Sequence, residues 1–137
     1  MPRPIGVKQI DHVTFVVADL ERSRAFYGDI LGMQPAPRPP FNFVGLWFAA
    51  GNTYVHLILE HDQSGPAGAS IPENVSISRT RHLAFEVASA RETIDLLGEH
   101  GVPIVSGPKN RPDGPIQLYV LDPDRNLIEL FSMENTI

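Results

Sequence analysis

The chain contains an internal repeat whose two copies each carry a histidine at the same position. His82 follows His12 by 70 positions (82 − 12), and at that spacing Phe85 matches Phe15. The valine and alanine that follow each phenylalanine match as well. A repeat of this kind predicts two modules of similar structure. Because it duplicates an imidazole together with the hydrophobic residues around it, it also predicts two half-sites that face one another, which is one way to assemble a metal centre.

The repeat extends to the last strand of each predicted module. Leu118 follows Leu46 by 72 positions (118 − 46), and Glu129 follows His56 by 73 positions (129 − 56). A drift from 70 to 73 is what small loop insertions produce. The repeat therefore spans the chain, and Glu129 occupies the position in the second module that His56 occupies in the first.

Each copy predicts the order β-α-β-β. In the first copy Asp19 is the expected N-cap of a helix over 21–31 that Gly32 ends. In the second copy residues 89–92 form a capping box, and Gly101 ends the helix. Strands are expected over 13–17, 44–48, 54–59, 82–88, 116–121 and 126–131. Each copy also has room for one further short strand, in 34–42 or in 102–106.

Length and composition indicate one domain of two modules. A chain of 137 residues suits a single compact domain, and each half is too short to bury a core by itself. We expect modules of about 7–60 and 80–133. The intervening segment, 61–79, is rich in Gly, Ser, Pro and Asn and is predicted to be a flexible linker.

The same composition excludes several kinds of function. A net charge of −5 and a pI near 5.4 argue against nucleic-acid or membrane partners. The chain has no cysteine, so disulfides, thiolate metal sites and cysteine nucleophiles are excluded. It shows no signal-peptide pattern and no apolar run of transmembrane length, so a cytoplasmic location is expected.

Alternation along the strands predicts one apolar face and one polar face. Side chains two residues apart share a face of a strand, so Phe15 and Val17 lie opposite His12. The apolar faces suit packing against helices. The other face gathers polar and aromatic side chains from both modules: His12, Trp47, His56, Glu60, His82, Glu86, Gln117, Tyr119 and Glu129.

Four of these residues are candidate metal ligands. His12, His56, His82 and Glu129 lie on the first and last strands of the two modules. Imidazole nitrogens with a carboxylate suit one divalent ion of iron, manganese, nickel, cobalt or zinc. His56 either completes the ligand set or serves as an acid or base beside the metal.

Several motifs resemble those of the vicinal oxygen chelate superfamily, which includes glyoxalase I, methylmalonyl-CoA epimerase, extradiol dioxygenases and bleomycin-resistance proteins. The resemblance covers residues 9–133 and rests on four motifs: Asp11-His12-Val13, Phe26-Tyr27…Leu31-Gly32, Val55-His56-Leu57 and Asp122-Pro123-Asp124-Arg125-Asn126-Leu127-Ile128-Glu129-Leu130. It implies an α+β fold of two βαβββ modules that form a cupped mixed sheet around a metal, with the helices on the outer face. It also implies a homodimer.

Residue by residue, the resemblance assigns metal-binding positions to His12, His82 and Glu129. His56 matches the fourth position, where glyoxalase I and the epimerase carry Glu or Gln. Arg125 replaces the usual Gly of the Asp-Pro-Asp-Gly turn. Tyr119 matches a tyrosine that assists ring cleavage in extradiol dioxygenases.

The resemblance implies a metal-dependent enzyme that acts on a small substrate with adjacent oxygens. The leading prediction is a glyoxalase I-like lyase or isomerase that works through a metal-bound enediolate, with Glu129, His56 and Tyr119 as catalytic groups. The alternatives are an iron-dependent extradiol-type dioxygenase and a resistance protein that binds a small molecule such as an antibiotic. Candidate substrate-binding residues are Trp47, Gln117, Arg38, Lys109 and Arg111.

Overall fold

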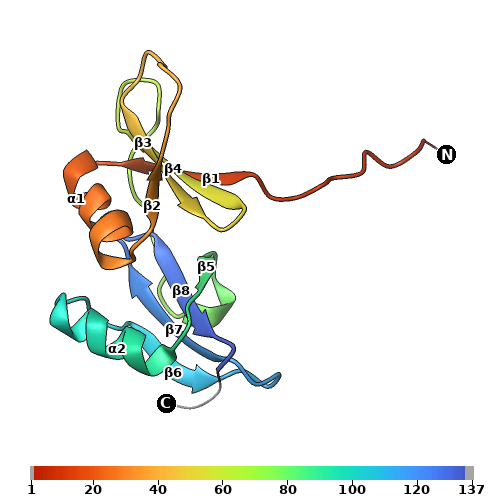
Figure 1. The fold of residues 1–137 in the computed structure, drawn as a ribbon, viewed down its shortest axis with the longest axis vertical. Coiled ribbons are helices and arrows are strands. Elements are labelled where there is room, and N and C mark those ends of the chain that lie inside the picture. The colour runs from red at the N-terminus through yellow and green to blue at the C-terminus, as the bar shows by residue number, and fades with distance from the viewer. Residues whose placement is uncertain (1, 135–137) are drawn as a thin grey trace.

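Two four-stranded mixed sheets, one from each module, form the body of the protein (Figure 1). The computed structural model describes residues 2–134, so Met1 and residues 135–137 of the predicted domain lie outside it. The first sheet has the spatial order β1 (His12–Val17), β4 (Thr53–Leu59), β3 (Gly45–Ala50) and β2 (Gln34–Ala36). The second has the order β5 (Leu83–Glu86), β8 (Leu127–Ser132), β7 (Ile116–Leu121) and β6 (Ser106–Asn110).

The two sheets have the same topology, which confirms the predicted α+β class and the βαβββ modules. In each sheet the first strand pairs in parallel with the last, and the remaining neighbours are antiparallel. The predicted additional strands are present as β2 and β6. β6 begins only at Ser106, the last residue of the predicted region, and its pairing with β7 has an irregularity between Ser106 and Lys109.

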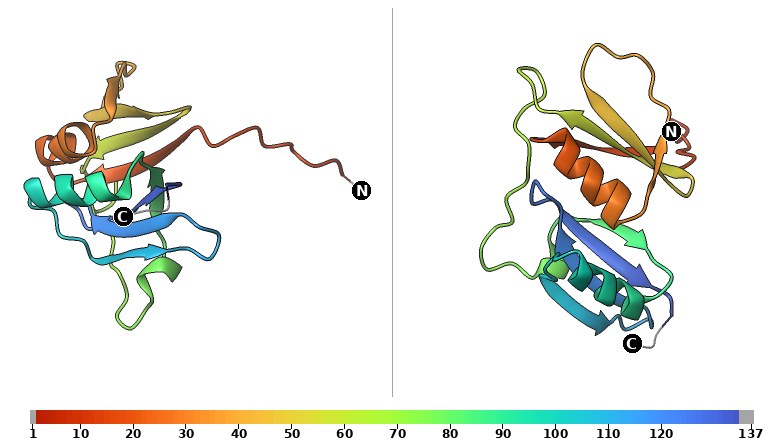
Figure 2. Two further views of the ribbon diagram at one scale, coloured as in Figure 1. Left: turned by 60° about the horizontal axis from the view of Figure 1, so that its bottom comes forward. Right: turned by 60° about the vertical axis from the view of Figure 1, so that its left-hand side comes forward.

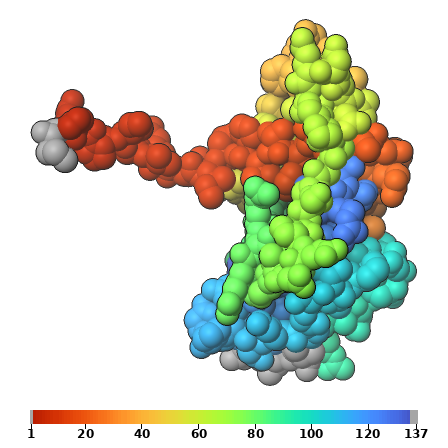
Figure 3. All heavy atoms as spheres, turned by 180° about the vertical axis from the view of Figure 1, so that it is seen from behind, coloured from red at the N-terminus to blue at the C-terminus, as the bar shows by residue number. Residues whose placement is uncertain are grey.

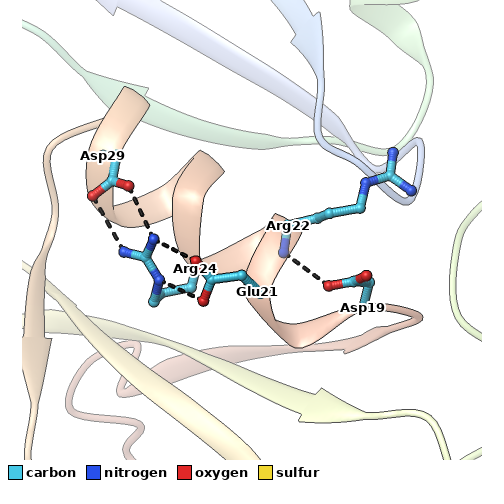
Figure 4. A network of polar contacts seen from close by, with 5 residues as sticks. All are labelled: Asp19, Glu21, Arg22, Arg24 and Asp29. Carbon is cyan, nitrogen blue, oxygen red and sulfur yellow. Dashed lines mark hydrogen bonds and ion pairs between the residues drawn. The ribbon is translucent and has the colours of Figure 1, made fainter.

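The helix of the first module begins where the sequence predicts. α1 (Leu20–Arg24) is capped by the Asp19 side chain, which accepts a 3.0 Å hydrogen bond from the Arg22 backbone N–H (Figure 4). It continues as the π-helical segment η1 (Ala25–Ile30). Arg24 lies between Glu21 and Asp29 and forms ion pairs with both, at 2.7 and 3.1 Å.

The helix of the second module follows the same plan. α2 (Ala90–Glu99) is capped by Ser89, whose hydroxyl accepts a 3.2 Å hydrogen bond from the Glu92 backbone N–H. Gly101, with φ of 70°, follows the helix end. Between the modules the linker contains a short 3₁₀ turn, η2 (Ile77–Arg79). No helix in the described part of the chain is long and apolar enough to span a membrane.

The helices of both modules lie on the same side of the molecule, at the left in Figure 1, with α1 against the first sheet and α2 against the second (Figures 1 and 2). Strand side chains on the helix-facing side of the sheets, as the alternation along the strands predicts, and side chains of the helices form one buried cluster that includes both modules. Its members are Val17, Phe26, Tyr27, Phe48, Val55, Leu57, Leu97, Leu118, Val120, Ile128 and Leu130. Hydrogen bonds also join the modules. Asp124 accepts from the Ala18 backbone N–H at 3.1 Å and from the Ser23 hydroxyl at 3.4 Å.

Candidate metal centre

The first half-site is a stack of three aromatic rings on β1, β4 and β3. The rings of His12 and His56 are 3.9 Å apart and 15° from parallel, and those of His56 and Trp47 are 4.0 Å apart and 1° from parallel. Trp47 is the cross-strand partner of His56 in the sheet, and Thr14 is its partner on the other side. Because these residues point to the face opposite the core, all three rings are partly exposed or exposed.

Asp11 orients the ring of His12. Its Oδ2 lies 2.7 Å from Nδ1 of His12. A carboxylate accepts a hydrogen bond from the ring N–H, and Nε2 then carries the free lone pair that a metal needs. The pKa of His56 lies below its usual value of 6.5, mainly because burial disfavours the charged ring and also because the charge of His12 is close. The lowered pKa favours the neutral imidazole of His56, the form that binds a metal.

The second half-site is a hydrogen-bonded group on β8 and β7 and the residues before β5. Nε2 of His82 lies 2.9 Å from Oε1 of Glu129. The Tyr119 hydroxyl donates to the same oxygen at 3.0 Å. Nδ1 of His82 lies 2.7 Å from the backbone oxygen of Thr80. Glu129 and Tyr119 come together because they are directly paired in the sheet.

The donor atoms of this group fit a divalent metal. A carbonyl oxygen only accepts hydrogen bonds, so Nδ1 of His82 carries a proton, and Nε2, the nitrogen left to bind a metal, faces Glu129. Two lone pairs at 2.9 Å repel each other unless a proton or a cation lies between them. Adjacent ligands of a metal with bonds of about 2.1 Å lie at a similar separation. The Thr80 carbonyl fixes the tautomer that a metal-bound His82 requires.

The second half-site is more enclosed than the first. Gln117, Tyr119 and Glu129 are only 7%, 2% and 6% exposed, although they lie on the face of the sheet that α2 does not cover. Figures 2 and 3 show the linker and η2 running across that face, on the side opposite α2. The side chain of His82 keeps 21% exposure beside them. The linker and η2 therefore lie over the sheet that carries Glu129.

The four predicted ligands form two pairs. His12 lies against His56, and His82 lies against Glu129. Within residues 2–134 of one chain, no three His, Asp or Glu side chains come close enough together to hold one ion. The single chain therefore presents two half-sites, each with two of the four ligands that the sequence predicts.

Two of the predicted substrate-binding residues lie beside the first half-site. Arg38 and Trp47 line a cavity of about 420 Å³ together with His12 and His56. Phe41 and Phe43 complete its wall, and they are further residues that the motifs did not indicate. They follow Arg38 in a loop rich in proline and phenylalanine, and that composition was the only sequence signal for an aromatic wall.

The other predicted substrate-binding residues belong to the second module. Gln117 is buried beside the second half-site. Arg111 forms an ion pair with Asp113 at 2.7 Å, and its guanidinium lies 5.8 Å from the centre of the Phe131 ring. Lys109 is exposed on β6, opposite Gln117 in the sheet. None of these three reaches the cavity at the first half-site.

A larger cavity, of about 710 Å³, separates the modules near η1 and α2. Its wall is mostly apolar and includes Glu86 and Glu92, and it contains none of the predicted metal ligands. Two of the four predicted ligands, His12 and His56, line the smaller cavity, which therefore belongs to the first half-site.

Comparison with known proteins agrees with this architecture. Residues 9–130 match the model of the Glyoxalase/Bleomycin resistance protein/Dioxygenase superfamily. The chain is 26% identical over 137 residues to Glyoxylase I 4 of Arabidopsis thaliana, covering 96% of this chain and 75% of that protein. It is 28% identical over 101 residues to mitochondrial methylmalonyl-CoA epimerase of Bos taurus, covering 72% and 57%.

A solved structure gives the same result for the fold. A putative glyoxalase family protein from Bacillus anthracis superimposes with a TM-score of 0.72 at 29% identity, covering 95% of this chain and 98% of that one. The matched model, the repeated βαβββ modules and the motif residues all agree. The chain belongs to the glyoxalase/bleomycin resistance protein/dioxygenase superfamily, the vicinal oxygen chelate group that its motifs resemble.

Proposed function

We propose that this protein is a metal-dependent enzyme of the glyoxalase I type, a lyase or isomerase acting on a small substrate with two adjacent oxygens. The observation that carries the proposal is the arrangement of His82. Its Nδ1 is engaged by the Thr80 carbonyl, and its Nε2 points at the Glu129 carboxylate 2.9 Å away. The relatives named glyoxylase I and methylmalonyl-CoA epimerase support the same kind of reaction.

The chain's own residues have distinct roles in this proposal. A divalent metal, when bound, supplies the positive charge that stabilises negative charge developing on the substrate oxygens. Glu129 or His56 takes the proton from the substrate carbon and returns it. Tyr119 holds Oε1 of Glu129 through its 3.0 Å hydrogen bond and so directs the carboxylate. The low exposure of Glu129 keeps water away from it.

We also propose that two copies of the chain complete each site, with His12 and His56 from one and His82 and Glu129 from the other. The separation of the half-sites within one chain supports this. So do the sheet edges: among the described strands β1 pairs only with β4, and β5 only with β8. Each module therefore has a free strand edge next to its half-site, and an unpaired edge favours pairing with another chain.

Metal analysis of the purified protein tests the site. We expect a divalent metal bound to the wild-type protein and lost from His12→Ala and from His82→Ala. His100→Ala is the control, because His100 is exposed at the end of α2. Unchanged metal content in the double variant His12→Ala/His82→Ala would sink the proposed site.

Mixing variants tests the dimer. In a heterodimer of His12→Ala with His82→Ala chains, a site shared between chains leaves one of the two sites fully wild-type. A site built within one chain leaves none. We expect the isolated heterodimer to recover about half of the metal bound by the wild-type dimer, and no recovery would contradict the shared site.

The identity of the metal and the reaction separate the remaining alternatives. Turnover of a hemithioacetal with nickel, cobalt or zinc supports the lyase. Stoichiometric iron with catechol-dependent oxygen uptake supports a dioxygenase. The hydrogen bond between Tyr119 and Glu129 favours this alternative. Tight binding of a small molecule without metal or turnover supports a binding protein of the resistance type.

A further inference from the structure

The loop between β2 and β3 is built around the guanidinium group of Arg38. The group lies 5.0 Å from the ring centres of both Phe41 and Phe43. Its Nη2 donates a 2.8 Å hydrogen bond to the backbone oxygen of Phe43. The two phenylalanine rings are stacked, 5.1 Å apart. These contacts fix the position of a long side chain that would otherwise be mobile.

Gly45 makes room for this arginine. A Cβ atom at Gly45 would clash first with the backbone oxygen of Leu57, and it would also lie 3.1 Å from Nη2 and 3.2 Å from Nε of Arg38. The guanidinium therefore lies directly against the backbone of β3. A side chain at Gly45 would crowd both the neighbouring strand and the arginine.

Arg38 forms no ion pair with a carboxylate among residues 2–134, unlike Arg24 and Arg111. Arg24 pairs with Glu21 and Asp29, and Arg111 pairs with Asp113. Arg38 is also half-buried. Withdrawing a cation from water without a counter-ion costs free energy, and an anionic ligand recovers it.

The surroundings of Arg38 define the rest of the ligand. Arg38 lines the cavity of about 420 Å³ with His12 and His56 at another part of its wall. Phe41 lies 6.2 Å from Trp47, ring centre to ring centre, so the aromatic side chains of the loop continue into the ring stack. Such a wall favours a flat or apolar body over a sugar or a polyol.

We propose that the substrate of this enzyme is an aromatic or similarly flat carboxylic acid whose carboxylate binds Arg38. Its flat body lies along Phe41, Phe43 and Trp47, which directs its other end towards His12 and His56. This inference rests on the proposed function, because it names a substrate only if the protein is an enzyme. Recognition by Arg38 does not itself require a metal.

The single tryptophan makes binding measurable without turnover. Trp47 lines the cavity and is the only tryptophan of the chain, so its fluorescence responds to a ligand there. The probes are 3-phenylpropionate and its uncharged analogue 3-phenylpropionamide, titrated into protein freed of metal by a chelator. We expect the acid to bind at least about tenfold more tightly than the amide, because it forms charge-assisted hydrogen bonds.

Variants assign the difference to Arg38. Arg38→Gln is expected to bind the acid no better than the amide, and Arg38→Lys to recover part of the preference. Arg22→Gln is the control: it removes the same charge from α1, outside the cavity, and is expected to behave like wild type. Far-UV circular dichroism of each variant shows whether it is folded.

Three results would overturn the proposal: equal affinity for acid and amide, an unchanged affinity of Arg38→Gln for the acid, or no saturable change in fluorescence with either compound. Because the protein is free of metal, the result is independent of whether the enzyme turns over a substrate. The result also does not depend on whether His12→Ala or His82→Ala loses metal. The proposed function and the assignment of Arg38 therefore fail separately.

Discussion

The hydroxyl group of Tyr27 donates a buried 2.6 Å hydrogen bond to Oδ2 of Asp122, 95 residues further along the chain. The same carboxylate oxygen accepts from the side chain of Asn126 at 2.9 Å, and Oδ1 accepts from the Asn126 backbone N–H at 2.8 Å. Burial, followed by the charge of Asp122, raises the pKa of Tyr27. This contact joins the helix of the first module to the turn of the Asp-Pro-Asp motif in the second. In this chain that part of the motif therefore holds the modules together.

Tyr27→Phe is expected to lower the free energy of unfolding by about 1–2 kcal/mol, because it leaves a buried carboxylate without one of its donors. Urea denaturation followed by circular dichroism measures the change. Tyr54→Phe is the control, since Tyr54 is 36% exposed and lies at the surface of β4. An equal effect of both variants would show that the Tyr27 hydroxyl has no special role.

Arg125→Gly is expected to stabilise the protein by about 0.5–1 kcal/mol. Arg125 has a φ of 66°, a backbone conformation that costs free energy for a residue with a Cβ and little for glycine. The gain is reduced because glycine has more freedom in the unfolded chain. Arg22→Gly in α1 is expected to destabilise by about 1 kcal/mol, and differential scanning calorimetry distinguishes the two signs. A lower melting temperature of Arg125→Gly would contradict the prediction.

Protonation of His56 is expected only below its usual pKa of 6.5, because burial and the nearby charge of His12 lower that pKa. The unfolded chain binds this proton first as the pH falls, so the free energy of unfolding decreases from about pH 6.5 downwards through the lowered pKa. The ring is stacked on Trp47, and its protonation quenches the fluorescence of Trp47. The quenching midpoint of the folded, metal-free protein should lie below 6.5 and disappear in His56→Gln. A midpoint at or above 6.5 contradicts the assignment.

The phenol of Tyr119 is expected to stay protonated well beyond neutral pH. Burial, and then the hydrogen bond to Glu129, raise its pKa from 10.0 to about 12. The unfolded chain loses this proton first, so the stabilising contribution is complete below about pH 10 and is lost between about pH 10 and 12. Absorbance at 295 nm measures the ionisation. Tyr119→Phe should remove an ionisation with a midpoint near pH 12. Removal of an ionisation near pH 10 would show that the pKa of this phenol is not raised.

Local patterns in the sequence were sufficient to predict the strands and the helix starts. Asp19 and Ser89 cap their helices as expected, because a cap depends on hydrogen bonds between residues three positions apart. The alternation of Phe15 and Val17 with His12 predicted the core face, because side chains of a strand alternate whatever the fold. The sequence predicts a flexible linker over 61–79, and no local pattern indicates that this segment runs across a face of the second sheet.

The spacing of the repeat places the histidines and Glu129 at equivalent points of two modules, because a repeat of residues is also a repeat of strand positions. How these points combine in space depends on the tertiary structure. The tertiary structure places His12 against His56 and His82 against Glu129 as two separate pairs, since each pair lies within one sheet and the two sheets share a core on their other faces. It also places Arg38 against Gly45 and beside two stacked phenylalanine rings. Contacts of this kind depend on how strands and loops come together in space, which no spacing along the chain specifies.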